Sequence, residues 1–270
     1  MSESEIILSA RDVQVSFGGT RALLGASVDV RKGTIHGIAG ANGSGKSTLL
    51  NVLSRIVRPQ AGQLEYQGKN LLSLPGHRVA REGIGRAFQT PVLFRGLSVI
   101  DNVMVGFQPD LKATALKDLI RWPGYRRSCR QAHERAMGLM DTFGVEQHLW
   151  EKPVDKLNLG QQRRVELVRV LACQPTLLLL DEPAVGLASR ELGELRELLL
   201  RVRDSGVTVM LVEHNVSFLR AVADVITVMD HGAVLAEGDQ NVFEDERVAA
   251  AYIGSVSVDA DEVPALGGEA

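Results

Sequence analysis

Short runs of apolar residues mark the expected buried strands of this chain. Three of them cover residues 34–39, 176–180 and 207–212, and His36 interrupts the first. Apolar runs of this length are consistent with strands that are buried on both faces. Apolar residues recur at helical spacing in residues 47–55 and 132–143, and Ala136, Leu139, Met140 and Phe143 share one face of the second stretch. This alternation of strands and helices predicts an α/β fold.

The chain of 270 residues is 45% hydrophobic, enough to bury a substantial core, and we expect one domain over residues 6–254. Residues 6–88 should form an antiparallel β edge and a loop followed by a helix, with a hairpin near residues 63–67. Residues 90–160 should form a helical subdomain, and residues 161–230 an alternation of helices and strands. A short strand at 234–237 and a helix at 246–253 should close the domain. The acidic tail, residues 255–270, has a composition typical of disorder.

A glycine-rich loop separates the first strand from the first helix. It matches the pattern G-x-x-x-x-G-K-[ST], and its candidate phosphate-binding residues are Gly40, Asn42, Gly43, Gly45, Lys46, Ser47 and Thr48. Glycines permit the backbone shapes that wrap a phosphate, and the loop amides and the helix N-terminus attract an anion. We therefore expect Lys46 to reach the β- and γ-phosphates of a nucleotide and Ser47 to bind Mg2+.

Polar residues follow the later strands. Asp181 and Glu182 come directly after residues 176–180, His214 follows residues 207–212, and Gln89 follows Arg86-Ala87-Phe88. Ligands collect at the carboxyl ends of strands in open α/β sheets. We expect Asp181 and Gln89 to complete the Mg2+ site with Ser47, Glu182 to act as general base, and His214 to lie at the same edge. Each of these residues alone is more often structural, so the prediction rests on the whole set, which indicates hydrolysis of ATP.

The order of these motifs resembles the nucleotide-binding subunits of ATP-binding-cassette (ABC) transporters, over residues 6–254. The resemblance implies a P-loop NTPase fold with a RecA-like core, an antiparallel β edge and a helical subdomain. It implies that Lys46, Ser47, Gln89, Asp181, Glu182 and His214 bind and hydrolyse ATP. Phe17 stands where the family has an aromatic residue that stacks on adenine, and the alternative is that Phe17 belongs to the core.

The family signature Leu-Ser-Gly-Gly-Gln corresponds here to residues 157–161, with Asn158 for the serine and Leu159 for a glycine. The resemblance implies that Asn158, Gly160 and Gln161 contact ATP held by a partner subunit. Asparagine still donates hydrogen bonds and caps helices. Ala188 replaces the usual Asp or Asn that makes a polar contact across the dimer. These departures suggest a weaker ATP site at this chain's signature, and favour a heterodimer over a homodimer.

The long middle region, the Gly160–Arg164 run and the ending Ala251-Tyr252-Ile253-Gly254 resemble ATPases of branched-chain amino acid importers, a group that also serves urea, amides and hydrophobic acids. The resemblance implies two transmembrane permease subunits and, indirectly, an extracytoplasmic solute-binding protein. Three alternatives stay open: a lipopolysaccharide-exporter ATPase, a soluble ABC ATPase, and a regulatory module that does not hydrolyse ATP. The basic residues Arg121, Arg126, Arg127 and Arg130, with Trp122 and Tyr125, fit either a contact with a membrane or a partner, or a solvated loop.

Charge and composition narrow the location and partners. A formal net charge of −3 disfavours nucleic-acid binding. No apolar run approaches the ~20 residues that span a bilayer, and the acidic N-terminus lacks the plan of a signal peptide. We expect a cytoplasmic protein, peripheral on the inner face of the cell membrane. The two cysteines, Cys129 and Cys173, do not have metal-site spacing, and reduced thiols are expected in that compartment.

Overall fold

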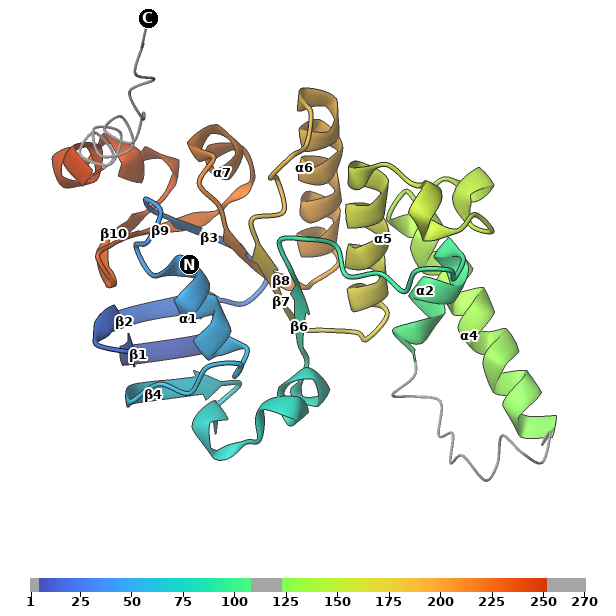
Figure 1. Cartoon of the computed structure of the whole chain (residues 1–270), viewed down its shortest axis with the longest axis horizontal. Coiled ribbons are helices and arrows are strands. Elements are labelled where there is room, and N and C mark those ends of the chain that lie inside the picture. The colour runs from blue at the N-terminus through green and yellow to red at the C-terminus, as the bar shows by residue number, and fades with distance from the viewer. Residues whose placement is uncertain (1–4, 108–122, 252–270) are drawn as a thin grey trace, which may run out of the picture.

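A computed structural model describes residues 5–107 and 123–251 (Figure 1). Its centre is a six-stranded sheet in the order β10-β9-β3-β8-β7-β6. The strands are β3 (Ile35–Ala39), β6 (Ile84–Ala87), β7 (Leu177–Asp181), β8 (Thr208–Val212), β9 (Val225–Asp230) and β10 (Ala233–Gly238). All neighbouring pairs are parallel except β10 with β9. The apolar runs in the sequence therefore form the buried parallel strands, as expected.

A second sheet has four antiparallel strands in the order β2-β1-β4-β5. These strands are β1 (Ile6–Phe17), β2 (Thr20–Arg31), β4 (Ala61–Tyr66) and β5 (Lys69–Asn70). The β4–β5 pair confirms the hairpin expected near residues 63–67.

The longer helices are α1 (Lys46–Leu53), α2 (Val99–Val105), α4 (Pro123–Thr142), α5 (Leu159–Leu171), α6 (Ser189–Asp204) and α7 (Val216–Val222). Short 3-10 helices cover Leu71–Ser73, Gly76–Glu82, Gln147–Leu149, Val154–Lys156 and Gln240–Glu244. Residues 246–251 are helical, as predicted for that part of the closing helix. The helix predicted over residues 132–143 begins earlier, at Pro123. The prediction began too late because the polar segment before Ala132 lacks the apolar stripe from which helical periodicity is recognised.

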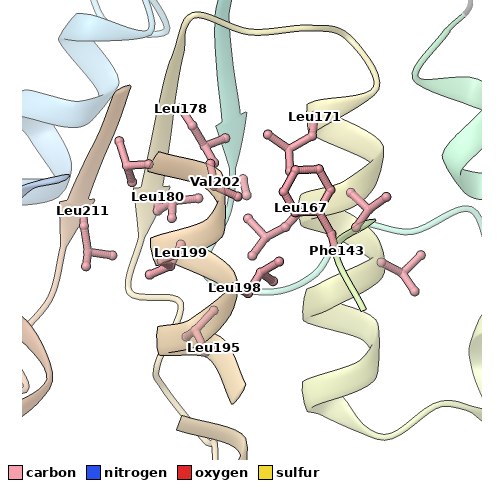
Figure 2. Packing of buried hydrophobic residues seen from close by; sticks show 14 of the residues in the cluster. Phe143, Leu167, Leu171, Leu178, Leu180, Leu195, Leu198, Leu199, Val202 and Leu211 are labelled. Atoms are coloured by element: carbon pink, nitrogen blue, oxygen red, sulfur yellow. The ribbon is translucent and has the colours of Figure 1, made fainter. Parts of the chain in front are cut away.

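The alternating side chains of β7 divide the core into two clusters. Leu177 and Leu179 lie in a cluster with α1 and the antiparallel sheet, whereas Leu178 and Leu180 lie in a cluster with α5, α6 and α7. Figure 2 shows Leu178 and Leu180 next to apolar side chains of α5 and α6. Both faces of the strand are buried because side chains of a β-strand point alternately to opposite sides. The six-stranded sheet is therefore a rigid, doubly covered support for the loops at its edge.

Some predictions fall on residues that the structure does not describe. The tail at 255–270, the ending 252–254, Arg121 and Trp122 lie outside the described residues, as do the side chains of Tyr125, Arg126 and Arg127. In the described part of the chain, every helix is too short or too polar to cross a membrane.

Three polar side chains form a hydrogen-bonded row across β3, β9 and β10, and the first of them, His36, lies four residues before the phosphate loop. His36 on β3 is fully buried, and its Nε2 lies 2.8 Å from the Thr227 hydroxyl. Thr227 donates in turn to Glu237 Oε2, also at 2.8 Å. Burial, helped by the charge of Arg31, lowers the pKa of His36 from 6.5 to about 4. The histidine is therefore neutral in the folded protein at neutral pH.

The shifted pKa of His36 predicts acid sensitivity. Between pH 6.5 and about 4 the unfolded chain binds a proton at this side chain that the folded chain does not. The free energy of unfolding should therefore fall with acidification across that window, by up to about 3 kcal/mol from this residue. Urea unfolding at several pH values will measure it, with His36→Gln as the control that shares every other titrating group. Identical pH dependence in the two proteins would contradict the prediction.

Candidate active site

The candidate site lies where four parallel strands end in register. Ile38 of β3 pairs with Val212 of β8, and Val212 pairs with Asp181 of β7. Backbone hydrogen bonds continue past this row, from Glu213 N to Ile38 O at 3.1 Å and from Glu182 N to Val212 O at 2.9 Å. The motifs predicted from the sequence therefore start from one edge of one sheet. The order of the strands brings together segments that are up to about 170 residues apart in sequence.

The phosphate loop needs its glycines for two different reasons. Gly40 and Gly45 have φ angles of 147° and 100°, in the region that side chains disfavour. At Gly40 a Cβ would lie 2.2 Å from Met229 O, and at Gly45 it would lie 2.6 Å from Ala22 O. At Gly43, where φ is 80°, a Cβ would meet no atom within 4 Å. The backbone is thus closely packed at the two ends of the loop and open at its middle.

Lys46 is buried at the first position of α1, and its Nζ donates to Gly40 O at 2.9 Å and Ala41 O at 2.8 Å. Burial lowers the pKa of Lys46, and the charges of Glu182 and Asp181 oppose that shift. The side chain is folded back over the loop that it follows. Its ammonium group is thereby held against the phosphate loop. Asn42 and Thr48 lie on either side of Lys46 in the same loop-to-helix segment of the sequence.

Two of the three residues predicted to bind Mg2+, Ser47 and Asp181, lie where they could share that ion. Ser47 Oγ lies 3.3 Å from Asp181 Oδ1, so a hydroxyl and a carboxylate converge from two elements. Oxygen ligands of this kind suit Mg2+, which binds through one or two protein oxygens plus substrate phosphates. Asp181 also pairs with Arg86, whose Nη2 lies 3.3 Å from Oδ2, and both side chains are largely buried. No motif in the sequence indicated this role of Arg86.

Glu182 is the centre of a cluster of polar side chains. Gln89 Nε2 donates to Glu182 Oε2 at 3.0 Å, and His214 Nδ1 lies 3.8 Å from Glu182 Oε1. Glu182 has a φ of 45°, a left-handed conformation that is unfavourable for this residue type. The structure therefore brings the three predicted catalytic residues into contact. It does so with a strained backbone at the carboxylate that would act on water.

Three buried charged residues beneath this cluster were not predicted. Glu213 accepts from Ala184 N at 2.7 Å, and burial raises its pKa. Glu166 and Arg163 lie one turn apart on α5, almost fully buried. Burial raises the pKa of Glu166 and lowers that of Arg163, and the charges of Glu166 and Glu213 counteract the shift of Arg163. The only sequence signal for them was their nearness to motif residues.

Phe17 ends β1 and is 50% exposed. The alternative that it belongs to the core is therefore wrong, and its ring is accessible to a flat ligand such as adenine.

The signature residues form the first turn of α5. Asn158 caps the helix by accepting from Gln161 N at 2.8 Å, while Gln161 Oε1 accepts from Asn158 N at 3.1 Å. This confirms the helix cap expected of Asn158, and the reciprocal bond from Gln161 makes it a capping box. A Cβ at Gly160 would lie 2.8 Å from Glu191 Oε1, so this glycine allows close packing on α6 within the same chain. Ala188 precedes α6, and its N–H donates to Glu191 at 3.0 Å.

Comparison with known proteins identifies the family. A family model described as ABC transporter matches residues 23–185, more than half of the chain. The chain belongs to the ABC transporter family. This membership confirms the predicted cassette fold and the prediction of an ATPase.

Relatives match almost the whole chain. The high-affinity branched-chain amino acid transport ATP-binding protein BraF of Pseudomonas aeruginosa is 33% identical over 253 residues, 93% of this chain and 99% of its own length. The corresponding LivG of Escherichia coli has the same identity and coverage. The lipopolysaccharide export system ATP-binding protein LptB of Escherichia coli is 33% identical over 248 residues, 92% of this chain and 97% of its own.

Solved structures agree with this assignment. The ADP conformation of MJ1267, an ATP-binding cassette of an ABC transporter, matches with a TM-score of 0.80 and 29% identity. The match covers 93% of the present chain and 100% of the MJ1267 chain.

The close contacts of Gly40 predict that even a methyl group there is harmful. In Gly40→Ala the new Cβ would collide with Met229 O and force the backbone of the phosphate loop to move, so affinity for ATP should fall by about tenfold or more. Gly193→Ala is the matched control, because a Cβ at this exposed position of α6 meets no atom within 4 Å. The control should bind ATP normally and gain up to about 1 kcal/mol of stability. Titration with a fluorescent ATP analogue and thermal unfolding will measure the two effects, and unchanged affinity in Gly40→Ala would refute this account.

Proposed function

We propose that this chain is the ATP-hydrolysing subunit of an ABC importer for branched-chain amino acids or related small amides and hydrophobic acids. The observation that carries the catalytic part is the contact of Gln89 and His214 with Glu182, beside the phosphate loop. The transport part is supported by the names of BraF and LivG, which match over almost their full length.

In the proposed reaction each residue has a distinct task. The amides from Gly40 to Thr48 bind the phosphates, Lys46 neutralises charge on the β- and γ-phosphates, and Phe17 stacks on adenine. Ser47, Asp181 and Gln89 would hold Mg2+, and the bound ion would neutralise charge that develops on the transferred phosphoryl group. Glu182 accepts a proton from the attacking water, while Gln89 and His214 fix the direction of that carboxylate.

We further propose that two ATPase subunits close head-to-tail on ATP, with Asn158, Gly160 and Gln161 facing the nucleotide of the partner. The capping box supports this role, because it uses Asn158 Oδ1 internally and leaves the Nδ2 donors for an external acceptor. A dimeric cassette, MJ0796 bound to ADP and Pi, shares the fold at 24% identity and a TM-score of 0.72. Ala188 and Leu159 favour a second, different ATPase as partner. Equal turnover after either ATP site of the complex is disabled would contradict this asymmetry.

We propose that the two permease subunits contact a groove of about 320 Å³ that is lined by the C-terminal ends of α1 and α5, by β6 and by the 3-10 helix Gly76–Glu82. Ile56, Val79 and Phe88 line it, and Val92, Phe94 and Leu97 are exposed on the segment that follows. Exposed apolar side chains gathered in this way are typical of protein interaction sites. The chain would then lie on the cytoplasmic face of the membrane, with a solute-binding protein on the other side. The groove itself is lined by residues outside 90–160, and Val92, Phe94 and Leu97 extend the surface into the predicted helical subdomain.

A second candidate is a lipopolysaccharide exporter, favoured by the match to LptB. The two functions require different partners, which makes them separable.

Purification of the tagged chain from gently solubilised native membranes will distinguish these functions. We expect two multi-span proteins, a second cassette ATPase and a solute-binding protein by mass spectrometry. Recovery with lipopolysaccharide-export components would favour the exporter. Recovery with soluble proteins alone would refute transport and leave the ATPase intact.

The role of Glu182 predicts a trapped state. Glu182→Gln removes the base and keeps the shape, so the turnover number should fall by roughly 10²- to 10⁴-fold while ATP still binds. When the Glu182→Gln variant and its partner ATPase subunit are run together on a size-exclusion column with ATP, they should elute as a persistent closed dimer. Glu237→Gln, on β10 and outside the cluster, is the control and should turn over ATP at the normal rate. Rapid hydrolysis by Glu182→Gln would overturn the assignment of the base.

A further inference from the structure

The first turns of α5 are bonded directly to the segment that carries Gln89. Arg163 Nη1 donates to Phe88 O at 2.6 Å, and Arg163 Nη2 donates to Gln89 O at 2.5 Å. In Figure 1 this segment leaves β6 and crosses α5 on its way to α2. One planar guanidinium group thus holds two consecutive carbonyl groups, which fixes the direction of the chain at Gln89.

Glu166 adds a third bond to the same segment. Its Oε1 accepts from Val92 N at 3.0 Å, and its Oε2 lies 3.8 Å from Arg163 Nη1. The two side chains are 2% and 1% exposed. A buried pair of charges remains in place only with such partners, because neither charge is solvated by water. The pair therefore ties residues 88–92 to α5 at three points, two carbonyls and one amide.

The same helix begins at the signature. Asn158 caps α5, and Arg163 lies little more than one turn farther along. At the other end of the contact, the side chain of Gln89 donates to Glu182. A continuous set of bonds thus runs from the end of α5 that faces the partner's nucleotide, through Arg163 and Glu166, to the carboxylate that acts on this chain's own nucleotide.

We propose that Arg163 and Glu166 are positioning residues, which make Gln89 move with the signature helix and so set the contact between Gln89 and Glu182 according to the position of α5. Neither side chain touches the reacting atoms. Displacement of α5 on contact with the partner's ATP is passed to Gln89 as a shift of its backbone, because the bonds of Arg163 are to the carbonyl groups and not to the side chain. This inference rests on the proposed role of Gln89 beside Glu182.

Turnover kinetics of the assembled complex will test this role. In Arg163→Gln the carbonyl groups of Phe88 and Gln89 lose their bonds to the guanidinium group. The turnover number kcat should then fall by roughly 10- to 100-fold, the usual effect of a small misplacement of reacting groups. KM for ATP should change by less than about twofold, because Lys46 and Phe17 are unaffected. Arg163→Lys keeps the charge beside Glu166 and should restore part of kcat. It also serves as the test variant if Arg163→Gln does not fold.

The next residue of α5 provides a matched control. Arg164 donates to a backbone carbonyl, Gly144 O, at 2.6 Å and pairs with Glu194 at 2.9 Å, but its bonds are to a segment remote from Gln89. Arg164→Gln loses bonds of the same kinds and should keep kcat within about twofold of the normal value. An equal fall in kcat in the two variants would mean that Arg163 is merely structural.

A double variant separates positioning from general damage. If Arg163 acts through Gln89, the combination of Arg163→Gln with Gln89→Ala should be no slower than Gln89→Ala alone. Multiplied effects would overturn the proposal. A normal kcat in Gln89→Ala would instead refute the proposed role of Gln89 itself, whereas a slow Gln89→Ala with a normal Arg163→Gln would refute this inference alone.

Hydrogen exchange gives a measurement that does not depend on catalysis. Amides of residues 88–92 should exchange faster in Arg163→Lys than in the unaltered protein, and not in Arg164→Gln. Unchanged exchange in Arg163→Lys would show that the guanidinium does not hold the segment, and would overturn the proposal.

Discussion

One row of backbone pairing across the central sheet controls the rest of the site. Ile38, Val212 and Asp181 lie side by side on three parallel strands, and Leu180 pairs with Ala87 on the fourth. Gln89, Glu182 and His214 follow this row at the ends of β6, β7 and β8, and β3 leads into the phosphate loop. A slip of one residue in any strand would turn its side chains to the opposite apolar cluster and shift the residues that follow the strand out of the site. The two apolar clusters that cover the sheet therefore also hold the active-site loops in register.

Electrostatics in this protein depends on burial more than on surface pairs. Lys46, Arg163, Glu166 and Glu213 all lie where desolvation disfavours their charge, and each is held by nearby carbonyls, amides or opposite charges. Groups bound in this way are fixed in direction, since any rotation would leave a charge without a partner. Fixed charges suit a site that must align a carboxylate, an amide and a phosphate before reaction. The exposed ion pairs, such as Lys32 with Glu5, have no comparable constraint.

Much of this arrangement could be predicted from the sequence, because local patterns encode it. The apolar runs defined the strands, the glycine and lysine spacing defined the phosphate loop, and Asn158 indicated a helix cap. The start of α4 was missed because its first residues lack an apolar stripe. Arg163, Glu166 and Glu213 were missed for a different reason: charged residues usually lie at the surface, and only tertiary packing shows that these are buried. A single sequence does not contain that information.

The left-handed backbone at Glu182 places stability and activity in opposition. A glycine or asparagine adopts a φ of 45° with less strain than glutamate does, by an amount on the order of 1 kcal/mol. If Glu182 is the general base proposed above, a change to glycine or asparagine would relieve backbone strain and remove that base. Efforts to stabilise the cassette should therefore leave this residue unchanged.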